Sequence, residues 1–326
     1  MNMESAPHRF RRLWLAAAAL AACAWTPVVP DANRIVRVEQ GDGSDDTVTV
    51  EMRDLGDGRF ETIVRIGEPM DRSAAVRRAA PRRAVAGTTV WYVDANATGA
   101  NDGSSWCNAF TDLSQALQNA AANNVGTMKV AKGSYAPSTI GLSDPRTATF
   151  VPFWATSGCE MIGGFAGCGA PDPDAYDPET NVTTLSGDLG IQGDDSDNAY
   201  SVVKDVNGVL SGLFKGFMVT GGNANGPLQS GTDIGGGAFF SGSPIVQRCR
   251  FVSNKARRNG GGAYFTHGVG QTEFSPQVDQ CRFDLNQAGS GAGVYCVARR
   301  AKFNGGRFEA NQALGYTDQS GFHVLG

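Results

Sequence analysis

Histidine is scarce in this sequence, and long hydrophobic runs are missing after its first residues. The three histidines among 326 residues are His8, His267 and His323, and they show neither a His-x-x-x-His spacing nor a Ser-His-Asp order. The sequence therefore indicates neither a histidine metal site nor a serine-hydrolase triad. The net charge of −4 argues against nucleic acid as a partner, because phosphate binding needs a positively charged surface.

Helical periodicity is missing from the C-terminal third, where glycine runs occur instead. A Phe-x-x-Asn pattern recurs there, with alanine two residues after each asparagine: Phe251 with Asn254, Phe283 with Asn286, and Phe308 with Asn311. The steps between these phenylalanines are 32 and 25 residues (283−251 and 308−283), and a degenerate copy starts at Phe217. Such spacing is typical of a repeat protein whose insertions loop out of a constant unit.

The composition of these units favours strands. Short apolar or β-branched pieces, such as residues 244–246 and 277–278, alternate with Gly, Asn and Ser, which is a pattern of strands and turns. Glycine and asparagine adopt left-handed backbone conformations cheaply, so we expect them at the corners of coils. Coils stacked at roughly 4.8 Å place equivalent side chains in ladders. The pattern predicts an all-β parallel β-helix, or solenoid, with structural ladders of phenylalanine and of asparagine.

The first residues match an export signal. Three arginines (Arg9, Arg11 and Arg12) precede an uncharged run at residues 13–22, which is too short to span a bilayer. The run ends Leu-Ala-Ala-Cys and resembles a bacterial lipobox, in which Cys23 would carry a lipid; ordinary cleavage nearby is the alternative. We predict a signal peptide over residues 1–23 and export to the cell surface, the outer membrane or the extracellular space.

Three further segments follow the signal. Residues 24–66 predict a small β-hairpin segment around Asp57-Gly58, which must pack on something else or fluctuate, because two strands alone are marginal in water. Residues 67–88 are rich in Ala, Arg and Pro and predict a linker. Residues 89–326 form the β-helix domain, and a helix with Thr111 as N-cap is expected to cover its first coil. We expect this domain to be truncated at its C-terminal end, or to be capped by another chain.

Several stretches carry a family resemblance. Residues 91–106, which open Trp-Tyr-Val-Asp, together with Ile-Gly-Gly-Phe-Ala-Gly at 162–167 and Leu-Ser-Gly-Asp at 185–188, resemble exported right-handed β-helix proteins of the pectin-lyase-like superfamily. The Phe-x-x-Asn and Gly-Gly-Ala-aromatic repeats resemble the polymorphic outer membrane protein family. The resemblance implies a right-handed β-helix on a surface-exposed passenger with adhesion or surface-structure roles.

Two functions fit these observations. The first is a non-catalytic, adhesin-like binding or structural surface, with glycans or another cell's surface as partner and with membrane contact only through a lipid anchor or a missing C-terminal portion. The second is a polysaccharide lyase or glycoside hydrolase acting on acidic glycans.

Carboxylates decide between the two functions. A lyase of this fold needs clustered carboxylates for Ca²⁺ and a cationic base, and a hydrolase needs two facing carboxylates. The candidates are Asp188, Asp194, Asp195 and Asp197, with Lys204 and Arg248 as cations. The competing interpretation makes these acids a solvated turn, and the acids of the repeats (Asp279, Asp284 and Glu309) are assigned to different positions in their units. We favour a chain without catalytic residues, metal or cofactor; Ca²⁺ belongs only to the lyase alternative.

Seven cysteines complete the inventory. Export permits disulfides, and six cysteines remain when Cys23 of the signal peptide is set aside. Cys159 and Cys168 flank a glycine-rich loop and are the predicted bridge. Cys249 and Cys281 occupy one repeat position, as stacked thiols or as a bridge. Cys107 and Cys296 have no assignment.

Overall fold

The computed structural model describes residues 34–38, 47–54, 60–67, 89–123, 125–152, 159–205, 212–267, 275–297, 301–314 and 322–324. The predicted signal peptide with Cys23, and residues 68–88 of the predicted linker, lie outside these ranges. The described part contains one α-helix, α2 (Leu113–Ala122), and a short 3-10 turn, η2 (Pro145–Thr147). None of its helices is long and apolar enough to cross a membrane.

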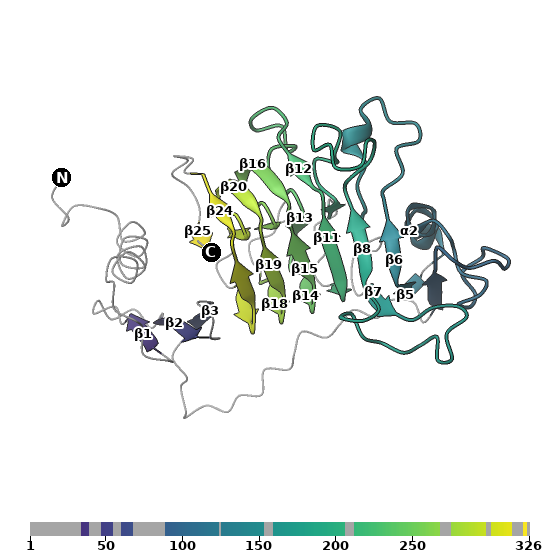
Figure 1. The fold of residues 1–326 in the computed structure, drawn as a ribbon, viewed down its shortest axis with the longest axis horizontal. Helices are drawn as coiled ribbons and strands as arrows, with labels where there is room; N and C mark the ends of the chain where they lie inside the picture. The colour runs from purple at the N-terminus through teal and green to yellow at the C-terminus, as the bar shows by residue number, and fades with distance from the viewer. Residues whose placement is uncertain are drawn as a thin grey trace.

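Four sheets of parallel strands run along the molecule (Figure 1), and each full repeat contributes one strand to each of them. In spatial order, the seven-stranded sheet contains β22 (Lys302–Asn304), β18 (Gln277–Asp279), β14 (Ile245–Gln247), β10 (Leu213–Lys215), β7 (Glu160–Phe165), β5 (Val125–Ala131) and β4 (Thr89–Val93). The six-stranded sheet contains β23 (Arg307–Glu309), β19 (Arg282–Asp284), β15 (Arg250–Val252), β11 (Phe217–Thr220), β8 (Thr183–Ser186) and β6 (Gly133–Tyr135).

The other two sheets are shorter. One contains β12 (Asn223–Ala224), β16 (Lys255–Asn259), β20 (Gln287–Ser290) and β24 (Gln312–Ala313). The other contains β25 (Phe322–Val324), β21 (Val294–Cys296), β17 (Ala263–Thr266), β13 (Ala238–Ser241) and β9 (Val203–Lys204), and its β25 is antiparallel to β21. The all-β prediction with parallel sheets is therefore confirmed, and the arrangement is compatible with a parallel β-helix or solenoid.

Phenylalanines from successive repeats stack in the core. Phe251, Phe283 and Phe308 are register partners in the six-stranded sheet. Their ring centroids are 5.0 Å apart at both steps, and the interplanar angles are 5° and 12°. The degenerate copy does not start where the sequence pattern places it, because Val219 rather than Phe217 is the partner of Phe251. Stacking is therefore continuous only over the three regular repeats.

A second ladder consists of asparagine amides at the corner after the six-stranded sheet, of which Asn254 and Asn286 are buried and Asn311 is partly exposed. Asn254 Oδ1 accepts from the Gly222 amide at 3.0 Å, and Asn286 Oδ1 accepts from the Asn254 amide at 3.0 Å. Asn311 Oδ1 repeats the bond with the Asn286 amide at 3.0 Å. Each Nδ2 group donates to a carbonyl of the preceding repeat, as Asn286 does to Phe251 at 2.8 Å. Each asparagine thus bonds the backbone of the neighbouring repeat through its side chain.

The prediction of left-handed glycines at the corners is confirmed, because Gly260 (70°) and Gly291 (59°) have positive φ, but the prediction of left-handed asparagines is wrong. The residue before each ladder asparagine has the positive φ, namely Ser253 (55°), Leu285 (58°) and Ala310 (50°). The asparagine itself is needed for its side chain, which reaches the neighbouring repeat. Glycine is required at the corner between β16 and β17, because stacked backbones approach closely there. A Cβ on Gly261 would lie 2.4 Å from the carbonyl oxygen of Gln287.

Helix α2 covers the first end of the stack, at the right of Figure 1. Leu113, Ala116, Leu117 and Ala120 are buried in the same core as the strands. The N-cap is Asp112, whose side chain accepts from the amides of Ser114 and Gln115. Thr111, the predicted cap, instead donates its hydroxyl to Asn101. A terminal unit that differs from the repeats is expected where an apolar cross-section must be covered.

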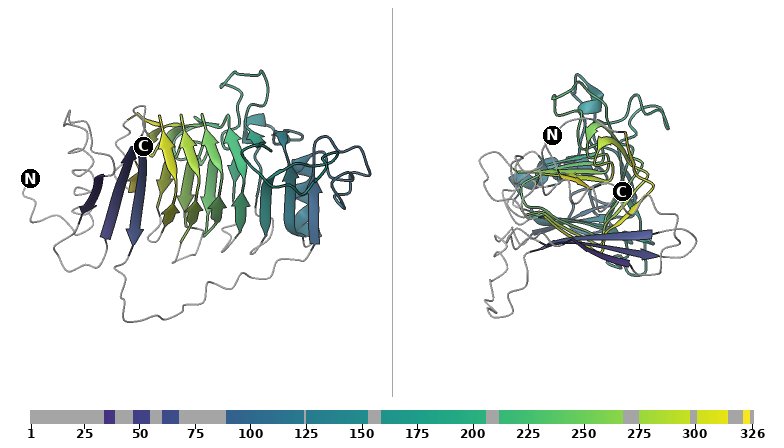
Figure 2. Two further views of the ribbon diagram at one scale, coloured as in Figure 1. Left: turned by 60° about the horizontal axis from the view of Figure 1, so that its bottom comes forward. Right: turned by 90° about the vertical axis from the view of Figure 1, so that its left-hand side faces the viewer.

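The N-terminal strands lie at the opposite end. β1 (Arg34–Val38), β2 (Thr47–Asp54) and β3 (Phe60–Gly67) form an antiparallel sheet of three strands, so the predicted hairpin gains β1. β3 contacts β22 and β23 of the last repeat (Figure 2). These are the outermost strands of their sheets, and outermost strands expose unpaired backbone groups. The N-terminal sheet therefore lies beside the edge that most needs cover.

We expect Asn286→Ala to destabilise the protein by about 2–5 kcal/mol, because it leaves the buried amide of Asn254 without its acceptor and removes a donor from the carbonyl of Phe251. Leu285→Ala is the matched control: Leu285 is 56% exposed, and alanine already occupies the equivalent left-handed position at residue 310. Its expected change is below about 0.5 kcal/mol. Urea unfolding measures both; equal losses in the two variants would contradict the role given to the amide.

Candidate functional site

The acidic cluster predicted from the sequence lies in the loop between β8 and β9. Its carboxylates bond mainly to their own loop: Asp188 accepts from the Gly193 amide at 3.0 Å, Asp194 from the Ser196 amide at 2.9 Å, and Asp197 from the Ile191 amide at 2.7 Å. The bond from the Ser196 amide lowers the pKa of Asp194. The loop is therefore built as a series of turns around its own acids.

Asp195 differs from the other three acids because it reaches a regular repeat. Its carboxylate forms an ion pair with Lys255 of β16, and its carbonyl accepts from the Asn223 side chain at 2.7 Å. Lys204, one of the two candidate cations, lies elsewhere, with Nζ 5.6 Å from the centre of the Phe239 ring. Burial lowers the pKa of Lys204. The structure thus does not bring the candidate base to the candidate acids through any described contact.

Arginines form a column on the outer face of the six-stranded sheet. Arg250, Arg282 and Arg307 are register partners on β15, β19 and β23, and we call them the arginine column. All three side chains are partly exposed, Arg282 the most at 43%. Each alternates with an inward phenylalanine on the same strand, so the pleat directs the arginines outward. The sequence carries the signal for this column, because Arg precedes Phe in each repeat.

Carboxylates pair with this column. Glu179 lies 3.4 Å from Arg250 and 3.8 Å from Arg282, and Glu309 pairs with Arg307 on the same strand. Asp284 and Glu309 are register partners, so the prediction that the acids of the repeats occupy different positions is wrong for this pair. Burial raises the pKa of Asp284, and the neighbouring Glu309 raises it further. The outer face is thus a band of alternating charge that can bind charged groups.

Tyr176 lies beside cations of the seven-stranded sheet and of the corner that follows it. Lys215 Nζ lies 4.6 Å from the centre of its ring, and Arg248, the second candidate cation, lies 5.5 Å from it. Burial raises the pKa of Tyr176 to about 12. The Arg250 side chain also donates to the carbonyl of Pro178 at 3.4 Å. Cations of several repeats therefore hold the loop around residues 176–179 against the sheet.

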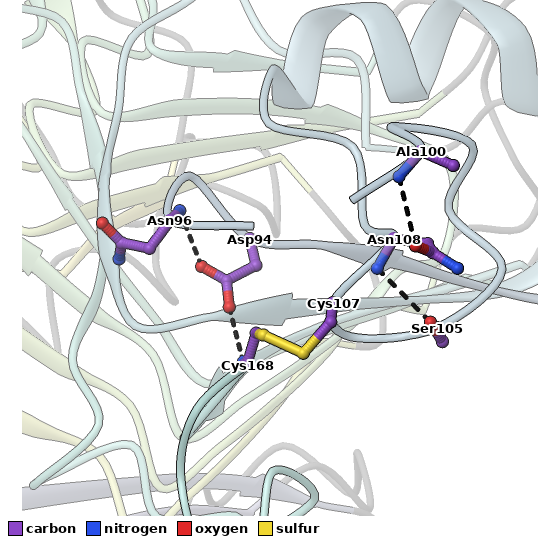
Figure 3. Close-up of a disulfide and its surroundings, with 7 residues drawn as sticks. All are labelled: Asp94, Asn96, Ala100, Ser105, Cys107, Asn108 and Cys168. Atoms are coloured by element: carbon purple, nitrogen blue, oxygen red, sulfur yellow. Dashed lines mark hydrogen bonds between the residues drawn. A yellow bond between two sulfur atoms is a disulfide. The ribbon is translucent and has the colours of Figure 1, made fainter. Parts of the chain in front are cut away.

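The disulfide joins Cys107 and Cys168, with Cα atoms 4.9 Å apart (Figure 3). The predicted bridge between Cys159 and Cys168 is wrong, because Cys168 pairs with Cys107, and Cys159 is buried outside this bridge. Cys159 and Cys168 lie on either side of β7, whose six residues form an extended strand about 20 Å long. The strand therefore holds the two cysteines apart. Asp94 supports the observed bridge, because its Oδ2 accepts from the Cys168 amide at 2.7 Å. Cys249 and Cys281 are buried thiols without a disulfide, and Cys296 is likewise buried outside the bridge.

Within the described ranges, no group of three or more His, Cys, Asp or Glu side chains is placed to hold a metal ion. No family model matches the chain, and no curated protein and no solved structure shows a significant match to it.

We expect peptide mapping without reductant to yield one linked peptide containing Cys107 and Cys168, with Cys159 recovered as an alkylated thiol after denaturation. Cys168→Ser should lower the free energy of unfolding by about 2–5 kcal/mol. Cys159→Ala is the control, and it should leave the linked peptide in place. A linked peptide that contains Cys159 would contradict the pairing.

We expect Asp284→Asn to raise stability at pH 7. The pKa of Asp284 is raised in the folded state, so its ionisation opposes folding above this pKa, and the gain should vanish below pH of about 4, where the acid is neutral in both states. Asp177→Asn should act in the opposite direction at pH 7, because hydrogen bonds from Glu179 and Thr180 lower the pKa of Asp177. Thermal melts at pH 7 and pH 3 test both; a loss of stability in Asp284→Asn at pH 7 would contradict the assignment.

Proposed function

We propose that the chain is an exported right-handed parallel β-helix protein, similar to the pectin-lyase-like superfamily and to polymorphic outer membrane protein repeats. It acts at the cell surface, in the outer membrane or outside the cell as a non-catalytic binding or structural surface. Its partners are glycans or another cell's surface. The Cys107–Cys168 disulfide supports export, because disulfides persist in oxidising compartments.

The arginine column is the observation that carries the binding role. Three guanidinium groups in register, one per repeat, offer donors that match carboxylate or sulfate groups along a polymer. The carboxylate of Glu179 already lies between Arg250 and Arg282, and it occupies a position that an acidic group of a ligand could share. A flat face of this kind suits an extended partner.

The alternative is a polysaccharide lyase or glycoside hydrolase acting on acidic glycans. It would use Asp188, Asp194, Asp195 or Asp197 around Ca²⁺, beside a cationic base. The hydrogen bonds of these acids to their own loop favour the binding role, since an enzyme needs its carboxylates directed at a substrate.

A screen of glycan polymers with the purified full chain tests the proposal. Bound polymer and released unsaturated or reducing ends are measured together, with and without Ca²⁺. We expect retention of acidic polymers without release of ends. Release that depends on Ca²⁺ and is lost in Asp194→Ala with Asp195→Ala would support the lyase instead.

A matched pair of variants tests the surface. Arg282→Gln should weaken binding roughly two- to fivefold, since one exposed ion pair contributes up to about 1 kcal/mol. Lys302→Gln removes the same charge from an exposed position on β22 of the seven-stranded sheet and should leave affinity unchanged. Equal losses in both variants would mean that overall charge, and not the arginine column, determines binding.

A further inference from the structure

Three buried side-chain oxygens lack hydrogen-bond partners in one short loop. They are Asp188 Oδ1, Asp197 Oδ1 and Asn198 Oδ1, and each atom is inaccessible to solvent. Asn198 as a whole is only 4% exposed. Buried acceptors without partners are rare in folded proteins, and an ionised carboxylate oxygen without a partner is the most costly kind. Their concentration in residues 188–198 therefore calls for a missing partner.

The three side chains belong to the same turn. Asp188 bonds the Gly193 amide through Oδ2, and Asp197 bonds the Ile191 amide through Oδ2, so both carboxylates enclose residues 190–193. Gly190 is part of this arrangement, because a Cβ there would lie 2.3 Å from Asp197 Oδ2. The Asn198 amide lies beside the same loop, with Nδ2 3.5 Å from Asp195 Oδ1.

The neighbouring cations do not satisfy these oxygens. Lys255 pairs with Asp195. Arg146 Nε donates to the backbone carbonyl of Asn198 at 2.7 Å, and a second guanidinium nitrogen donates to the carbonyl of Asn223 at 3.0 Å. Both cations bond other atoms, and the three oxygens remain without partners. The missing partner must therefore come from outside the described chain.

We propose that residues 188–198 form a structural Ca²⁺ site whose protein ligands include Asp188, Asp197 and Asn198. Ca²⁺ takes six to eight oxygen ligands in flexible geometry, so backbone carbonyls and water complete the shell. The Asn198 oxygen adds an amide ligand to two carboxylates, which agrees with the lack of any described group of three acidic, His or Cys ligands. The ion fastens the loop to the repeats, because Asp195 of this loop contacts Asn223 and Lys255. This role is independent of ligand binding by the outer face.

Thermal melting of the full chain, first treated with EDTA and then given CaCl₂ at 1 or 10 mM without any glycan, tests the site. We expect Ca²⁺ to raise Tm, by about 5–10 °C once its concentration reaches about 100 times Kd. Asp188→Asn and Asp197→Asn should abolish the rise. Asp194→Asn is the matched control from the same loop and should keep it, because Asp194 bonds only the exposed turn at Ser196 in the described contacts.

Without Ca²⁺, the unaltered chain should lose its advantage in melting temperature over the variants. In EDTA, Asp197→Asn should melt at or above the temperature of the unaltered chain, because the substitution removes a charge from a buried oxygen that lacks a partner. Isothermal titration of the unaltered chain should find one Ca²⁺ per molecule, and this measurement stands if a variant fails to fold. A Tm that ignores Ca²⁺, or that rises equally in Asp197→Asn, would overturn the proposal and leave ordered water as the partner of these oxygens. An equal response to Mg²⁺ would overturn the choice of ion.

Discussion

The stacking of one repeat on the next depends on the asparagine amides at a single corner. Asn254, Asn286 and Asn311 each accept from the preceding repeat's corner amide and donate to one of its carbonyls. These bonds determine which residue of one repeat faces which residue of the next. The phenylalanine stack and the arginine column follow from that register, because side chains on one strand alternate between inside and outside.

The two ends of the stack are covered by different means. Helix α2 places its apolar face on the first strands, whereas the last repeat has β1–β3 beside it. The last repeat is also less buried than its equivalents, since Phe283 is fully buried and Phe308 only partly. Stability should therefore fall toward the C-terminal repeats, as in other proteins whose repeats contact only their neighbours.

Charged groups outside the core are largely paired within the chain. The arginine column carries its own carboxylates, and Lys215 and Arg248 hold Tyr176. An acidic ligand of the outer face would have to displace Glu179 from Arg250 and Arg282. Each contact would therefore be weak, and binding would depend on repeated contacts along a polymer. The acidic loop at residues 188–198 lies elsewhere, beside Asn223 and Lys255 of the four-stranded sheet. Binding of an ion there would stabilise the loop and would have no catalytic role.

The repeat, the all-β class and the ladder residues could be predicted from the sequence, because the recurrence of Phe, Asn and Gly can be read directly from the order of residues. The sequence also contained the arginines before each phenylalanine. Three features could not be predicted without the fold. Cys168 pairs with Cys107, 61 positions away, and Val219 rather than Phe217 aligns with Phe251. Asp188, Asp197 and Asn198 each have a buried oxygen without a hydrogen-bond partner. Each of these features depends on the conformation of loops of unequal length between successive strands, and the spacing of residues along the sequence does not specify that conformation.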